Sequence, residues 1–209
     1  MAAVLTFSAT AQAQTQDCYD FCNEDPCCEN NNPFYAEILG GANFLQITGS
    51  ASNSIKCKTG YVVSGSLGYR LCYGVRVEAE YVYRKTSLNT VKFVGHHVPC
   101  HGYFQSSSYM VNALWDIPLS SWGCDFWKVQ PFIGAGIGYD CLKVKARAQN
   151  TDATTHGSKK GFAWQLMIGG AYPIYCNTDI SLEYKFHKGS AQHLYNHSVG
   201  VGLTYNFGS

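Results

Sequence analysis

Long stretches of this chain alternate between apolar and polar residues at every second position. The clearest stretch is Val75–Leu88, where Val, Ala and Tyr alternate with Arg and Glu. A period of two indicates a β-strand, because successive side chains of a strand point to opposite faces. Eight such stretches follow one another along the chain: Phe34–Thr48, Thr59–Tyr73, Val75–Leu88, Tyr103–Ile117, Val129–Val144, Gly161–Tyr175, Ile180–Lys188 and His193–Phe207. The pattern therefore predicts an all-β chain with eight long strands.

The lengths of the strands and of their connections indicate a membrane protein. His193–Phe207 is much longer than an ordinary strand of about 5–6 residues, whereas a tilted strand needs roughly 9–11 residues to cross a bilayer. Short turns, such as the one at Tyr73–Gly74, alternate with longer polar loops, such as Ala146–Lys160. An even strand number with short turns on one side is typical of bacterial outer-membrane barrels. We predict an eight-stranded antiparallel up-and-down transmembrane β-barrel over residues 34–207, with both termini in the periplasm.

The polar face of the strands is expected to point into this barrel. A soluble eight-stranded barrel would instead turn its apolar face inward around a ligand. Here the polar face carries charges of both signs interleaved with Gly and Ser, which fit the narrow interior of an eight-stranded barrel. Aromatic residues gather near both ends of the apolar runs, as in the belts at the two membrane interfaces. The charges expected inside are Glu37, Arg70, Arg76, Glu78, Glu80, Arg84, Glu183 and Lys185.

The composition agrees with one membrane barrel. The chain has 209 residues, of which 46% are hydrophobic and only 14% are charged. It contains no run of about 18 apolar residues, so no transmembrane helix is expected. The net charge of +1 gives no reason to expect binding to nucleic acid.

The first residues indicate export. Residues 1–13 resemble the end of a signal peptide, with an apolar segment and an Ala-x-Ala cleavage site at Ala11–Ala13, although a basic n-region is missing. The alternative is a disordered Ala/Thr/Gln tail. Residues 14–33 lack apolar periodicity and form a cysteine-rich leader that we expect in the periplasm. Disulfides are expected in this leader, and a zinc knot is the alternative.

The predicted topology divides the ten cysteines between the two ends of the barrel. The periplasmic group is Cys18, Cys22, Cys27, Cys28, Cys72, Cys124 and Cys176, and the outer group is Cys57, Cys100 and Cys141. A disulfide requires Cα atoms within about 7 Å, so no bridge can span the membrane. Both groups are odd in number. At least one thiol on each side is therefore either free or paired with another molecule, and we keep both possibilities open.

Three histidines form a candidate metal site outside the leader. His96, His97 and His101 lie close together in a predicted outer loop, beside Cys100. Imidazole and thiolate are transition-metal ligands, but a flexible loop leaves such a site unorganised, so we expect solvated residues and no metal. The chain has no G-x-S-x-G, H-E-x-x-H or phosphate-loop motif, so we expect no enzyme and no cofactor.

Three stretches of the barrel also carry a resemblance to a known family. VQPFIGAGIGY, DISLEYKFHK and HSVGVGLTYNF, in this order and spacing, resemble the OmpA/opacity-like family of small outer-membrane β-barrels. The resemblance covers roughly residues 34–207. It implies insertion by the barrel-assembly machinery, which reads a terminal aromatic signal similar to Tyr205-x-Phe207, although Gly208–Ser209 follow here. The abundance of cysteine resembles the disulfide-linked envelopes of chlamydia-like bacteria.

Three classes of function remain open on the sequence. The first is a structural or surface-antigen barrel in contact with outer-membrane lipid, linked through disulfides to other envelope proteins. The second is a narrow porin-like channel, and the third is a lipid-modifying barrel enzyme. An eight-stranded barrel is filled by its own side chains, which argues against a wide pore. His197 and Ser198 point to opposite faces, which argues against a catalytic pair at this position.

Overall fold

The computed structural model describes residues 33–47, 55–93, 96–118, 129–148, 154–191 and 194–207. The signal peptide expected at residues 1–13 and nearly all of the expected leader lie outside these residues. No helix within the described ranges combines the length and apolar character needed to cross a bilayer.

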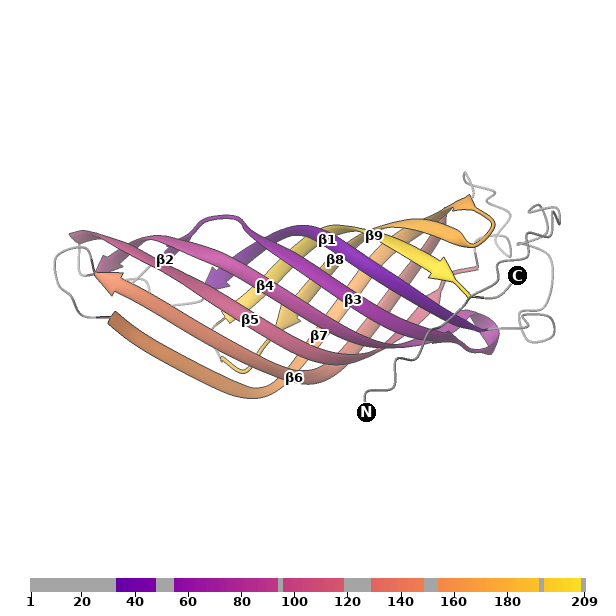
Figure 1. The fold of residues 1–209 in the computed structure, drawn as a ribbon, viewed down its shortest axis with the longest axis horizontal. Helices are drawn as coiled ribbons and strands as arrows, with labels where there is room; N and C mark the ends of the chain where they lie inside the picture. The colour runs from indigo at the N-terminus through magenta and orange to yellow at the C-terminus, as the bar shows by residue number, and fades with distance from the viewer. Residues whose placement is uncertain are drawn as a thin grey trace, which may run out of the picture.

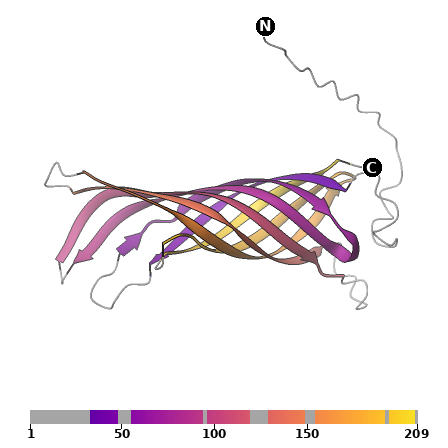
Figure 2. The same cartoon turned by 90° about the horizontal axis from the view of Figure 1, so that it is seen from below.

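Eight long antiparallel strands form a closed ring (Figures 1 and 2). Each long strand pairs with the next long strand along the chain, and the first pairs with the last, so the predicted eight-stranded barrel is confirmed. A ninth, three-residue strand pairs with residues 88–91. The strands are β1 (Phe34–Ile47), β2 (Ile55–Cys57), β3 (Gly60–Arg70), β4 (Val75–Phe93), β5 (His96–Asp116), β6 (Gln130–Ala148), β7 (Thr154–Tyr175), β8 (Thr178–Lys188) and β9 (Leu194–Asn206).

The first and last strands close the barrel. β1 and β9 pair antiparallel from Tyr35 opposite Asn206 to Ile47 opposite Leu194. Beyond the ladder, the backbone N–H of Phe207 donates to the carbonyl of Phe34, 3.0 Å away. The start of β1 and the end of β9 therefore lie at the same end of the barrel, together with the turns that join β3 to β4 and β7 to β8 (Figure 1). We call this the short-turn end and the opposite end the long end.

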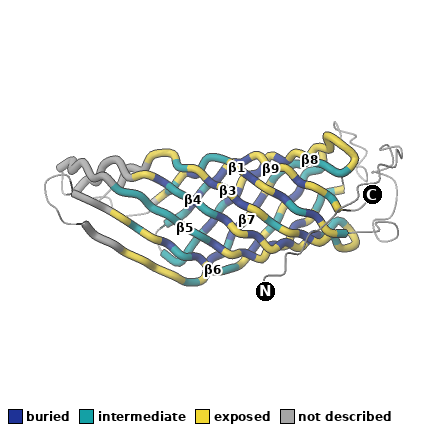
Figure 3. The backbone as a smooth tube through the Cα atoms, in the orientation of Figure 1, coloured by how far each residue is buried: buried dark blue, intermediate teal, exposed yellow. Residues whose placement is uncertain are grey.

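The wall of the barrel has two chemically different faces. Buried and exposed residues alternate along the strands (Figure 3), as in β8 and β9. On β1, Ile38 is 65% exposed, whereas its neighbour Glu37 is 7% exposed. Leu, Ile, Val and aromatic side chains cover the outside, and most charged residues of the central wall are buried inside. This arrangement places the apolar face toward lipid and the polar face in the interior.

Four strands extend further at the long end than the sequence pattern predicts. β4 and β5 continue to Phe93 and His96, which pair with each other, and β6 and β7 continue to Ala148 and Thr154. The loops predicted at residues 89–102 and 146–160 are therefore largely wrong, because most of these residues form ladder pairs. The extended hairpins project beyond the shorter β8 and β9 (Figure 1). A strand outside hydrocarbon needs no apolar face, so its sequence can resemble that of a polar loop.

The turn between β3 and β4 is tight. Strand β3 ends at Arg70 rather than at Tyr73, because Tyr73 has φ 62° and ψ 30° and Gly74 has φ 73°. These left-handed values reverse the chain, and Gly adopts them without the steric cost that a Cβ carries. The residues Cys72–Gly74 form a short 3-10 segment, and Cys72 is exposed there.

We predict that the outer face of β9 does not tolerate a charge at mid-height. Val201 is 52% exposed and lies between Tyr205 and Tyr195 on this face. Val201→Arg should lower the free energy of unfolding in lipid vesicles by about 2–4 kcal/mol, because the guanidinium must enter hydrocarbon. Urea titration followed by heat-modifiable gel migration measures this change. Val201→Leu is the control and should be nearly neutral; equal effects of the two substitutions would contradict the assignment of faces.

Candidate functional site: the charged interior of the barrel

An ion-pair cluster crosses the middle of the barrel. Lys185 Nζ of β8 lies 2.6 Å from Glu80 Oε1 of β4 and 3.1 Å from Glu183 Oε2. All three residues are buried. A buried charge is tolerated only when it is paired and hydrogen-bonded, so these contacts hold opposite walls of the barrel together at this level.

Two amides complete the surroundings of Glu80. Asn112 Nδ2 of β5 and Gln165 Nε2 of β7 donate to Glu80 Oε2 at 2.9 and 2.7 Å, and Gln165 Nε2 also donates to Asn112 Oδ1 at 2.8 Å. Gly136 of β6 faces this group, and a Cβ there would collide with Asn112 Oδ1. The glycine thus makes room for the amide. The network therefore joins side chains from four strands across the lumen.

A second cluster fills the short-turn end of the lumen. Arg76 Nη2 lies 2.9 Å from Asp116 Oδ1, and Arg70 Nη1 lies 3.6 Å from Asp116 Oδ2. Both guanidinium groups also lie over the ring of Tyr35, at 5.5 and 5.0 Å from its centroid. The Tyr35 hydroxyl donates to Glu78 Oε1 at 2.5 Å. Salt bridges and cation–π contacts thus occupy this end of the interior.

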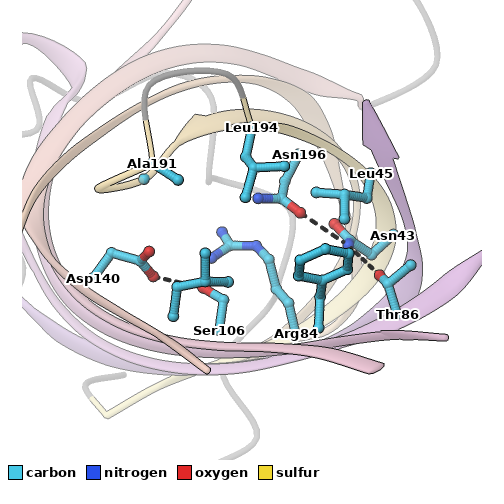
Figure 4. A pocket seen from close by; sticks show the side chains of 12 residues that line it. Asn43, Leu45, Arg84, Thr86, Ser106, Asp140, Ala191, Leu194 and Asn196 are labelled. Carbon is cyan, nitrogen blue, oxygen red and sulfur yellow. Dashed lines mark hydrogen bonds between the residues drawn. The ribbon is translucent and has the colours of Figure 1, made fainter. Parts of the chain in front are cut away.

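A third cluster lies toward the long end (Figure 4). The hydroxyls of Ser106 and Ser108 both donate to Asp140 Oδ1, at 2.5 and 2.8 Å. Arg84 Nη1 donates to Ser108 Oγ at 3.1 Å. Arg84 Nε and Nη2 are buried and have no hydrogen-bond partner among the described residues. The same holds for both ring nitrogens of the buried His187.

A small cavity adjoins this third cluster. Its volume is about 20 Å³, and Arg84, Asp140, Ser106, Asn43 and Asn196 supply polar groups to its lining. Figure 4 shows these side chains converging from several strands. A volume of this size holds about one water molecule. Side chains therefore fill the lumen at all three levels, which matches the small diameter of an eight-stranded barrel.

The structure buries seven of the eight charges that the sequence places inside. Arg70 is half-buried at the short-turn rim. Several partners of these charges were not among the residues that the sequence predicted for the interior: Tyr35, Asn112, Asp116, Asp140, Gln165 and Asp179. The signal available in the sequence was the position of these residues on the polar face. The charges that they contact lie mostly on other strands, so the sequence pattern could not identify the pairs.

The histidine candidates lie on a strand rather than in a loop. The backbone of His96, His97 and His101 belongs to β5, paired with Phe93, Lys92 and Arg147. Their side chains lie outside the described residues. No group of three potential metal ligands occurs among the side chains that the structure describes.

The candidate cysteines are placed only in part. Cys72 and Cys176 lie in the turns of the short-turn end, and Cys141 is a free thiol, half-buried on the outer face of β6. Cys57 and Cys100 belong to β2 and β5, but their side chains lie outside the described residues, as do Cys18, Cys22, Cys27, Cys28 and Cys124. The pairing of the two groups therefore stays a prediction.

Several solved barrels share this fold. Neisserial surface protein A aligns with a TM-score of 0.56 and 16% identity, over 84% of this chain and 98% of that protein. Ail, the attachment invasion locus protein of Yersinia pestis, solved with the heparin analogue sucrose octasulfate, aligns with a TM-score of 0.51 and 13% identity, over 82% and 97%. At such identities the similarity concerns the fold alone.

The sequence comparisons point to the same class. An outer membrane protein of Gluconacetobacter diazotrophicus is 33% identical over 164 residues, which cover 67% of this chain. The match spans 42% of that relative's length. The family model described as outer membrane protein beta-barrel domain matches residues 1–207. The chain therefore belongs to this family of outer-membrane β-barrel proteins.

Proposed function

We propose that this protein is a closed structural barrel of the outer membrane with a surface-antigen role. Its long end faces the exterior, and its short-turn end, where β1 begins and β9 ends, faces the periplasm. The extended hairpins of β4–β7 would then form its exposed surface (Figure 1). The alternation of long and short connections supports this orientation, because outer-membrane barrels keep their short turns in the periplasm.

The observation that carries the proposal is the occupied lumen. Lys185, Glu80 and Glu183 cross its middle, while Arg76 and Asp116 pair nearer the short-turn end. The cavity at the other end has room for about one water molecule. A continuous aqueous path would require these pairs to separate, so the interior serves stability better than transport.

We further propose that disulfides link the short-turn end to the leader and to other envelope proteins. Cys72 and Cys176 are exposed in turns at this end, and neither is a free thiol, in contrast to Cys141. The chain enters the barrel here at Phe34, and the four leader cysteines precede this residue by 6 to 16 positions in the sequence. An exported chain with many cysteines favours disulfides over free thiols.

The enzyme alternative receives less support. Ser106 and Ser108 donate to Asp140, whereas a serine nucleophile donates to a histidine base. These groups are also buried inside the barrel, away from lipid. On the outer face, His197 Nδ1 lies 2.7 Å from the Tyr184 hydroxyl rather than beside a serine. The arrangement therefore favours a structural role for these polar side chains.

We predict that the monomer conducts little or no steady current in planar bilayers, because ion pairs fill its lumen. Single-channel recording on the refolded protein measures this. A stable, large, ion-permeable channel would favour the porin-like alternative and would contradict the structural proposal.

We predict that Lys185→Met lowers the free energy of unfolding by about 3–5 kcal/mol, because Glu80 and Glu183 remain buried without their cation. Urea titration in lipid vesicles measures the loss. The double variant Glu80→Gln/Lys185→Met removes one of the two stranded carboxylates and should recover part of the stability. An additive or greater loss in the double variant would show that the pair does not act as a unit.

We predict that non-reducing gels of intact envelopes show this protein in high-mass species that collapse with reductant. Replacing Cys18, Cys22, Cys27 and Cys28 together by Ser should abolish most of this cross-linking and leave the barrel folded, because none of the paired strands includes the leader. Cys141→Ser is the control and should change nothing. If the protein runs only as a monomer without reductant, and alkylation finds no reductant-sensitive thiols, the result would instead favour zinc binding by the leader.

A further inference from the structure

A group of lysines lies on the outer face of the wall near the long end. Lys85 of β4 and Lys143 of β6 flank Gln105 of β5 in the ladder, and Lys145 of β6 pairs with Tyr103 of β5. These three lysines point outward, because the residues between them on each strand point into the barrel. Neighbouring strands lie about 4.8 Å apart, so the lysines form one compact patch. We call it the β4–β6 lysine patch.

No carboxylate balances this patch among the described residues. The described carboxylates point into the barrel or lie at the short-turn rim: Glu37, Glu78, Glu80, Asp116, Asp140, Asp179 and Glu183. The ammonium groups of Lys85 and Lys145 instead lie over the ring of Tyr103, at 4.9 and 5.9 Å from its centroid. One aromatic ring thus holds two cations, which repel each other. An anion bound between them would relieve this repulsion.

The height of the patch on the wall limits what can bind there. Lys85 follows Tyr83 by two residues, and Lys143 follows Tyr139 by four, on the same outer face. Tyr83 and Tyr139 belong to the outer aromatic belt, which marks the boundary between hydrocarbon and headgroups. Below this belt, the outer face carries apolar side chains such as Ile137, which is 61% exposed. The patch therefore lies at headgroup level, directly above a surface that contacts acyl chains.

We propose that the β4–β6 lysine patch binds the phosphate groups of an anionic lipid in the outer leaflet. Lysine binds phosphate as a point charge, and three ammonium groups on one face suit a headgroup with more than one phosphate. The acyl chains of the same lipid would lie along the apolar wall below. A soluble polyanion would gain nothing from that wall, which is why the observations favour a lipid. The inference rests on the proposed orientation, which places the long end in the outer leaflet.

The test is the binding of bis-phosphorylated lipid A to the refolded protein in neutral detergent micelles. Lys85→Gln/Lys143→Gln/Lys145→Gln should weaken this binding at least tenfold, because all three phosphate-facing charges are lost. The control, Lys159→Gln/Lys188→Gln, removes charge from described lysines outside the patch and should change the affinity less than threefold. Heat-modifiable migration establishes that both variants fold.

Two further probes separate the sources of the anion. Dephosphorylated lipid A and inorganic phosphate should both bind more weakly than bis-phosphorylated lipid A. Equal losses of affinity in the patch variant and the control variant, or no loss in either, would overturn the proposal. So would tighter binding of a soluble sulfated polysaccharide that is lost in the patch variant, because the ligand would then be a polyanion. The measurement in micelles does not depend on orientation, so it can succeed even if surface labelling of intact cells places the long end in the periplasm.

Discussion

The pairing of β1 with β9 is the constraint on which the rest of this structure depends. A strand in hydrocarbon cannot leave its backbone groups without hydrogen-bond partners, since each unsatisfied group costs several kcal/mol. The ladder from Tyr35–Asn206 to Ile47–Leu194 removes the two open edges that eight strands would otherwise expose. Closure also creates an interior separated from lipid. The position of every inward side chain then follows from the register of this ring.

The closed ring gives each strand two different environments. The outer face contacts lipid and carries exposed apolar side chains, such as Ile38, whereas the inner face is too narrow for bulk water. Charged side chains in such an interior must satisfy each other. Lys185 does so with Glu80 and Glu183, and small residues such as Gly136 leave space for the amides that complete the network. The fold and the filled lumen are therefore two consequences of one closed ring.

The wall near the long end has different surroundings from the wall in the middle of the barrel. There the wall rises past the aromatic belt, so its outer face meets headgroups and water. The lysines of β4 and β6 belong to this region, and the carboxylates of the described residues do not. The barrel thus separates its charges by environment: carboxylates and their cationic partners meet inside, whereas the lysines of the β4–β6 lysine patch have no carboxylate beside them among the described residues.

The sequence by itself determined the strand number, the antiparallel order and the division into two faces. A period of two is a local property, and it is strong wherever one face meets lipid and the other does not. The pattern failed at the outer ends of β4–β7, because a strand outside hydrocarbon is not required to alternate and can resemble a polar loop in sequence. It placed Glu80 and Lys185 on the inner face but could not pair them, since they lie 105 positions apart. Only the closed ring, whose stagger sets the height of each residue, decided which inward charges meet and which outward lysines share one ring of Tyr103.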